Sequence, residues 1–281
     1  MNAIEYADQA SEIFVLSDSF IRIKELIDNE SSTIDDISDV ILVDPALAGT
    51  ILKLANSAFF HYPGKIDTTS KALLVLGITE IYNLVIAYSS TKAFKNTFVK
   101  QDYLDDFWEK SVDCALLIKY LGCHLHVHNS EQLFILGLLH NLGELVIQQV
   151  SPDKVEQCAS DDLADLPWGK QQGILGFTYG ECTAELLKLW QLPYSLVSPI
   201  RQQDEADFSQ VNIESQLLYI AKRVMMQKRV FNADCSKFLI SDKQLMLAGI
   251  EREVLHQAVE YCDLERLNIL SVLNPSAAMI Y

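Results

Sequence analysis

His140 and Asn141 stand together in a stretch that is otherwise almost wholly apolar, FILGLLHNLGELVI at residues 134–147. An imidazole in such surroundings can ligate a metal ion or act as a general base, and Glu144 follows four residues later on the same helical face. The alternative is a core histidine whose nitrogens are satisfied by hydrogen bonds, the commoner state of a single histidine in an apolar helix. The chemistry of these residues alone leaves both interpretations open.

A second group of metal-binding side chains occurs in LGCHLHVHNS at residues 121–130, where His124, His126 and His128 alternate. An extended segment would place the three imidazoles on one side, a geometry suited to nickel, copper or zinc. The segment connects Gly122 to a helix cap at Ser130, and clustered polar residues are ordinary in such a connection. We therefore interpret it as a solvated loop and expect only adventitious metal binding there.

The composition narrows the classes of partner. Lys and Arg number 22 against 38 Asp and Glu, a formal net charge of -16. Such a surface repels phosphate backbones and anionic lipid, so we expect neither a nucleic-acid nor a membrane partner. Six cysteines without a C-x-x-C pair indicate reduced thiols and a cytoplasmic protein.

Helical periodicity dominates the second part of the chain. Apolar residues recur at steps of three and four from Leu104 to Leu121, which predicts a helix ending at Gly122. Residues 133–147 are apolar on nearly all sides and predict one unbroken central helix that carries His140. Further helices are predicted at 153–160, 179–190, 212–229, 242–248, 251–262 and 264–273.

The first part of the chain is also helical. A Thr33–Asp36 cap pattern, the Asp44–Pro45 pair and Gly77 mark expected helix ends. The apolar pattern breaks at residues 95–103, KNTFVKQDY, the best internal boundary. We predict an all-α fold with an N-terminal helical subdomain at 1–100 and a second helical subdomain at 101–281.

Five segments resemble, in order and spacing, signature segments of the HDOD (HD-related output domain) family, a non-enzymatic relative of the HD superfamily of metal-dependent phosphohydrolases. They are ILVDPALAGTILKLANSAFF, KIDTTSKALLVLGITEIYNLVIA, FWEKSVDCA, GLLHNLGELVI and LLKLWQLP. The resemblance covers about residues 12–205. It implies an N-terminal helical subdomain packed on an HD-like bundle and a regulatory role in bacterial signalling.

The chain departs from the HD pattern at the positions of the metal ligands, which read Lys110, His140 and Asn141 and, by a looser alignment, Lys222. Such sites need neutral imidazoles and anionic carboxylates, and two ammonium groups would repel the cation. We therefore expect no bound metal, no cofactor and no phosphohydrolase activity, with His140 retained as a hydrogen-bonded core residue. We also expect Lys110 to donate to Asn141 or Glu144, since a buried cation without a partner is costly.

Three functions remain to be compared. The first is a non-catalytic signalling module that binds another protein or a nucleotide messenger. The second is a degenerate HD-type phosphohydrolase that still uses His140. The third, by analogy with HD proteins that bind nucleotides, is a small-ligand sensor with a pocket between its halves. The oligomeric state is not predicted.

An aromatic cluster in ANSAFFHYPGK, residues 55–65, is the candidate partner surface. Phe59, Phe60 and Tyr62 follow a predicted helix end, on a connection that usually lies at the surface. Exposed aromatic side chains favour recognition, whereas Phe59 and Phe60 turned inward would only seal the helix end. Both readings stay open.

Overall fold

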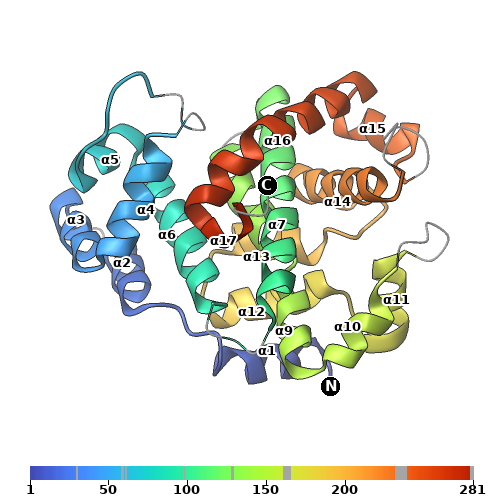
Figure 1. The fold of residues 1–281 in the computed structure, drawn as a ribbon. Coiled ribbons are helices and arrows are strands. Elements are labelled where there is room, and N and C mark those ends of the chain that lie inside the picture. Colours follow the sequence, from blue (N-terminus) through green and yellow to red (C-terminus); the bar gives the residue numbers. More distant parts are fainter. Residues whose placement is uncertain are drawn as a thin grey trace. The chain divides into compact units, whose positions relative to one another are not determined.

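The computed structural model describes residues 1–281 except 30, 58, 59, 61, 96, 98, 128, 129, 161–165, 232–238 and 279–281. The described residues form α-helices and no β-strand, which confirms the predicted fold class. They divide into two compact units (Figure 1). Unit 1 is Met1–Phe14 with Thr97–Leu264, and unit 2 is Val15–Asn96 with Glu265–Tyr281.

Unit 1 carries most of the helices. They are α1 (Ala3–Ser11), α7 (Gln101–His124), α8 (Ser130–Leu139), α9 (Leu142–Val150), α10 (Pro152–Cys158), α11 (Pro167–Leu175), α12 (Tyr179–Leu189), α13 (Tyr194–Arg201), α14 (Ile213–Phe231), α15 (Asp242–Ala248) and most of α16 (Arg252–Leu273). The long helix α7 packs against α8 and α14, while α12 packs against α1, α9 and α13. The core of this unit therefore forms around α7 and α12.

Unit 2 comprises α2 (Asp18–Asp28), α3 (Ile34–Val43), α4 (Pro45–Ala55), α5 (Thr69–Leu76), α6 (Ile78–Ala93) and, from the end of the chain, the last part of α16 and α17 (Pro275–Ala278). Its helix ends follow the sequence signals. Thr33 and Asp36 form a reciprocal capping box, and Asp44 accepts hydrogen bonds from the backbone N–H groups of Ala46 and Leu47. Gly77 ends α5 with a φ of 90°, a conformation that favours glycine.

The units differ from the predicted division at 1–100 and 101–281 at both ends of the chain. Helix α1 belongs to unit 1 because it packs on α9 and α12. In Figure 1 it lies next to these two helices. The Tyr6 hydroxyl lies 3.0 Å from Ser151 Oγ, and Trp190 Nε1 donates to the Phe14 carbonyl at 3.1 Å. These long-range contacts are not visible in sequence periodicity.

Several helices differ from the sequence-based expectation. Helix α7 continues past Gly122, where a Cβ would come within 2.0 Å of Leu133 Cδ1, so this glycine permits a close helix crossing and does not end the helix. The helices α1, α11 and α13 were not predicted, because each is only eight or nine residues long and its apolar pattern spans little more than two turns. Residues 251–273, predicted as two helices, form the single helix α16, since neither Gly nor Pro interrupts them.

Among the described helices, the stretch Gln132–Val150 is long and apolar enough to cross a membrane, and the bent pair Thr69–Leu76 with Ile78–Ala93 passes the same criterion. For Gln132–Val150, 72% of the apolar window is buried inside the protein. Such burial is typical of a core helix that is covered by other helices.

Candidate functional site

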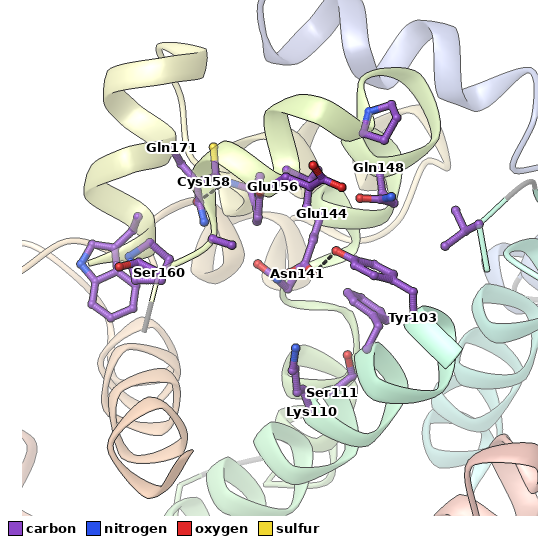
Figure 2. A pocket seen from close by; sticks show the side chains of 18 of the residues that line it. Tyr103, Lys110, Ser111, Asn141, Glu144, Gln148, Glu156, Cys158, Ser160 and Gln171 are labelled. Carbon is purple, nitrogen blue, oxygen red and sulfur yellow. Dashed lines mark hydrogen bonds between the residues drawn. The ribbon is translucent and has the colours of Figure 1, made fainter. Parts of the chain in front are cut away.

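A pocket of about 860 Å³ opens within unit 1, lined by α7, α9, α10, α11 and α14 (Figure 2). Helix α7 contributes Tyr103, Phe107 and Lys110, which share one face at steps of four and three residues. Helix α9 follows Asn141 and contributes Glu144 and Gln148 in the same way. The spacing of these residues along two helices thus builds two walls of one cavity.

The pocket brings together the four residues that the sequence resemblance assigns to the positions of HD metal ligands. Lys110, His140, Asn141 and Lys222 all line it, although they come from α7, the α8–α9 turn and α14. All residues of the lining belong to unit 1, so the pocket does not depend on unit 2.

The central helix expected at 133–147 is broken at His140 and Asn141. Helix α8 ends at Leu139 and α9 begins at Leu142, with a turn between them. A Cβ on Gly137 would lie 2.4 Å from Ala115 Cα, so α8 passes α7 at backbone contact just before the turn. Gly143 likewise has room for no Cβ, because the Tyr179 carbonyl oxygen would be 2.2 Å away. The two glycines hold the turn between α7 and α12.

His140 is buried and has a defined tautomer. Its Nδ1 lies 2.6 Å from the Gly137 carbonyl oxygen, which can only accept, so Nδ1 carries the proton and Nε2 a lone pair. The side-chain amide of Gln203 donates to the His140 carbonyl at 2.8 Å. Burial and the nearby Lys222 ammonium lower the pKa of His140 to about 4, and the imidazole is therefore neutral at pH 7.

Lys222 forms a largely buried ion pair. Its Nζ donates to Asp204 Oδ1 at 2.6 Å, and the two side chains are 11% and 13% exposed. The ammonium also lies 5.6 Å from the centre of the Trp168 ring, which is covered by the Arg223 guanidinium at 4.2 Å. Burial lowers the pKa of Lys222, while Asp204 opposes this shift. A fixed cation thus stands beside His140.

Lys110 does not make the expected bond to Asn141 or Glu144. It pairs instead with Asp106, one turn earlier on α7. Asn141 Nδ2 donates to Glu144 Oε2 at 2.5 Å, and the Tyr103 hydroxyl donates to Glu144 Oε1 at 2.5 Å. Both oxygens of Glu144 are thereby occupied, as Figure 2 shows for Tyr103 and Asn141 beside it. Lys110 pairs with an acid on its own helix instead.

Most of the lining was not among the sequence candidates, and four of these residues make the point. Tyr103, Cys158, Gln171 and Tyr179 join the pocket from four helices. Burial and Glu144 raise the pKa of Tyr103, which keeps its phenol protonated and donating. The Tyr179 backbone N–H donates to Gln171 Oε1 at 2.9 Å. Only Tyr103 had a signal in the sequence, since it lies seven residues before Lys110 on the same helical face.

No three His, Cys, Asp or Glu side chains come together as metal ligands in the part of the chain that the structure describes. His124 is exposed in the last turn of α7, and His126 has a φ of 53°. The segment around them is therefore not extended. The one-sided arrangement of imidazoles that was considered for metal binding does not form at residues 124–126. His128 lies outside the described residues.

The aromatic cluster belongs to unit 2 and not to the pocket. Phe60 is half-buried, and Tyr62 is 37% exposed with its ring against Gly64. Phe59 lies outside the described residues. Recognition by this surface stays a prediction.

Helical architecture and the His140–Asn141 turn at a central pocket define an HD-like helical fold. The HDOD domain model matches residues 13–206, more than half of the chain, and the chain belongs to the HDOD family. A curated protein of Treponema pallidum (strain Nichols), described as uncharacterized, is 26% identical over 205 residues. That match covers 71% of this chain but only 39% of the relative, so this chain spans well under half of the relative's length.

Solved structures share the fold. A protein of Shewanella amazonensis SB2B, provisionally named a phosphohydrolase, has a TM-score of 0.71 at 23% identity, with 98% of each chain covered. A protein of Marinobacter aquaeolei VT8, provisionally named a signal transduction protein, has a TM-score of 0.71 at 20% identity over 97% of this chain and 61% of that one. An HDOD domain protein of unknown function from Geobacter sulfurreducens has a TM-score of 0.69 at 18% identity, with 97% of each chain covered.

Proposed function

We propose that this chain is a non-catalytic HDOD module that regulates a bacterial signalling process by binding. The observation that carries the proposal is the Lys222–Asp204 ion pair beside His140, at 2.6 Å and largely buried. An ammonium group fixed at this place repels the divalent cation on which HD-type hydrolysis depends.

The other lining residues support the same proposal. Lys110 and Asn141 stand where HD enzymes carry a nitrogen ligand and a carboxylate, and neither an ammonium nor a neutral amide replaces them well. Glu144, the acid nearest to Asn141, is engaged by two donors and is not available as a free ligand without breaking both bonds. The Marinobacter protein that shares this fold carries a signal transduction name, in keeping with a regulatory role.

Metal content and turnover test the non-catalytic part. Untagged protein, and a variant with His124, His126 and His128 changed to alanine, are analysed for iron, manganese, zinc and nickel by mass spectrometry. We expect no stoichiometric metal in the variant and no cleavage of nucleotides, cyclic dinucleotides or model phosphodiesters above background.

The opposite result favours the alternative function. His140 Nε2 is a neutral imidazole nitrogen that lines the pocket, the one feature that a degenerate phosphohydrolase would still use. About one metal ion per chain that survives the loop changes and is lost with His140→Ala, together with phosphodiester cleavage, would establish that hydrolase and refute the non-catalytic module.

The binding part is tested on the aromatic cluster. Phe60→Ala with Tyr62→Ala is compared with the wild type for capture of a signalling partner from native cytosol, and both proteins are melted. We expect weaker capture with a nearly unchanged melting temperature, because Tyr62 is exposed and Phe60 only half-buried. A large drop in melting temperature with capture intact would assign these rings to the fold instead.

A further inference from the structure

The charges that line the pocket are not evenly distributed. Of its acids, Asp153 and Glu156 are exposed on α10, and Glu144 already accepts from Tyr103 and Asn141. The deeper charged groups are the ammonium of Lys222 and, partly exposed, that of Lys110. The inner part of the cavity therefore presents two ammonium groups, each paired with an aspartate that is not part of the lining, although the whole chain is strongly acidic.

The hydroxyl of Ser111 faces the cavity next to Lys110. Ser111 is 1% exposed, lines the pocket, and has no hydrogen-bond partner among the described residues. Figure 2 shows Lys110 and Ser111 next to each other on α7, with the amine and the hydroxyl directed toward the side of the pocket that carries Asn141. Because this hydroxyl opens into the cavity, an acceptor that enters can take its hydrogen bond.

An apolar wall adjoins the cationic end. The Trp168 ring lies 5.6 Å from Lys222 Nζ, and Phe107, Met225 and Met226 line the same cavity. A ligand group that pairs with Lys222 is thereby brought within contact distance of an indole. The volume of about 860 Å³ accommodates a small organic molecule and is larger than an inorganic ion needs.

We propose that this pocket binds a small organic anion, a phosphate or carboxylate joined to an aromatic ring, with the anion at Lys110, Lys222 and Ser111 and the ring beside Trp168. The inference rests on the proposed function, since it assigns to the lysines an anion where a hydrolase would hold a metal ion. Ammonium and hydroxyl donors form strong charge-assisted hydrogen bonds to phosphate and carboxylate oxygens. Asp106 and Asp204 hold the two lysines in place through their ion pairs.

Binding is tested by calorimetry with four probes that separate the parts of the ligand. Phenyl phosphate and benzoate carry both the ring and the anion, phenol has only the ring, and inorganic phosphate has only the anion. We expect saturable, one-to-one binding of phenyl phosphate, benzoate or both, with phenol and inorganic phosphate at least about tenfold weaker. The first two probes also show whether phosphate or carboxylate is preferred.

Variants locate the site. Lys110→Met and Ser111→Ala should each weaken the favoured probe about tenfold, roughly the loss of one charge-assisted hydrogen bond. Lys228→Met is the matched control, because Lys228 lies on α14 after Lys222, pairs with Asp263 and does not line the pocket. For the binding assay, Lys222 is changed together with its partner, as Lys222→Met with Asp204→Asn, since the single change would leave a buried carboxylate unpaired.

The fluorescence of Trp168 gives a second readout. The other two tryptophans, Trp108 and Trp190, are 3% and 8% exposed and do not line the pocket. Phenyl phosphate or benzoate should change the emission of the wild type, and Trp168→Phe should abolish the change while calorimetric binding persists. A change that is retained in Trp168→Phe would place the ring elsewhere and contradict the proposal.

The outcomes separate this inference from the proposed function. If none of the four probes binds up to about 10 mM, or if Lys110→Met and Ser111→Ala bind as the wild type does, the ligand inference fails while the non-catalytic function stands. Free phenol is measured in the same phenyl phosphate samples. Release of phenol that is lost with His140→Ala would overturn the proposed function itself, and the ligand inference with it.

Discussion

At the scale of single residues, the state of His140 follows from what surrounds it. The pKa of His140 is lowered to about 4 by burial and by Lys222, so the folded protein holds it neutral. In the unfolded chain it takes up a proton near pH 6.5. Between these two values the unfolded state binds more protons, and stability therefore falls as the pH decreases.

We expect the His140 contribution to be fully present above pH 6.5 and to be lost progressively as the pH falls toward 4. This contribution of His140 to the free energy of unfolding is about 3 kcal/mol. Urea unfolding of wild type and His140→Gln at pH 7 and pH 4.5 isolates this term from the carboxylates. Nitrogen NMR should show Nδ1 protonated and no titration of His140 between pH 5.5 and 8; a midpoint near 6.5 would contradict the burial argument.

The Lys222–Asp204 pair is the second residue-scale determinant of the pocket. Removing one partner leaves the other charge buried, so Lys222→Met should cost about 3–5 kcal/mol in unfolding free energy. The double change with Asp204→Asn should recover a large part of this loss, because no uncompensated charge remains. Urea titrations of Lys222→Met, of Asp204→Asn and of the double variant, each compared with the wild type, form a double-mutant cycle. Additive losses of unfolding free energy would mean that the two residues do not couple.

At the scale of elements, glycines determine how the helices approach one another. Gly137 lies where α8 crosses α7, and the atoms that its Cβ would meet are backbone atoms of Ala115 and Cys114. Backbone cannot rotate away as a side chain can, so the two helices would have to separate.

We expect Gly137→Ala to destabilise unit 1 by at least about 3 kcal/mol and to distort the His140 turn. The matched control is Gly173→Ala in α11, where nothing lies within 4 Å of the added Cβ. That change should stabilise by about 0.5–1 kcal/mol, because alanine favours a helix. Denaturant midpoints of both variants are compared; equal midpoints would show that the α7–α8 crossing is adaptable.

At the scale of the whole molecule, the chain does not divide in sequence order. Residues 1–14 pack in unit 1, more than eighty residues away along the chain from the rest of that unit. Tyr6, Ala7 and Ala10 are buried there, whereas Ile4 on the same helix is 55% exposed.

Tyr6→Ala should therefore lower the unfolding free energy by about 3–5 kcal/mol, since it empties a core site and removes the contact with Ser151. Ile4→Ala should change it by less than about 0.5 kcal/mol. Thermal melts of the two variants test the assignment. Similar melting temperatures would indicate that α1 adds little to unit 1.

The sequence by itself determined the helical class, the capped ends at Thr33, Asp44 and Gly77, and the family. These are local properties, because a cap or an apolar stripe is written within one or two turns of chain. The departures from the HD ligand pattern at Lys110, Asn141 and Lys222 were also readable, since each is a matter of residue type. The tertiary structure alone decided that α8 stops before His140, that Lys110 pairs with Asp106, and that Ser111 lines the pocket next to Lys110. It also decided that α1 joins unit 1 and that Gly122 lies inside α7. Each of these depends on what a residue meets from a distant part of the chain, and a backbone contact such as Gly137 on Ala115 leaves no periodic trace in the sequence.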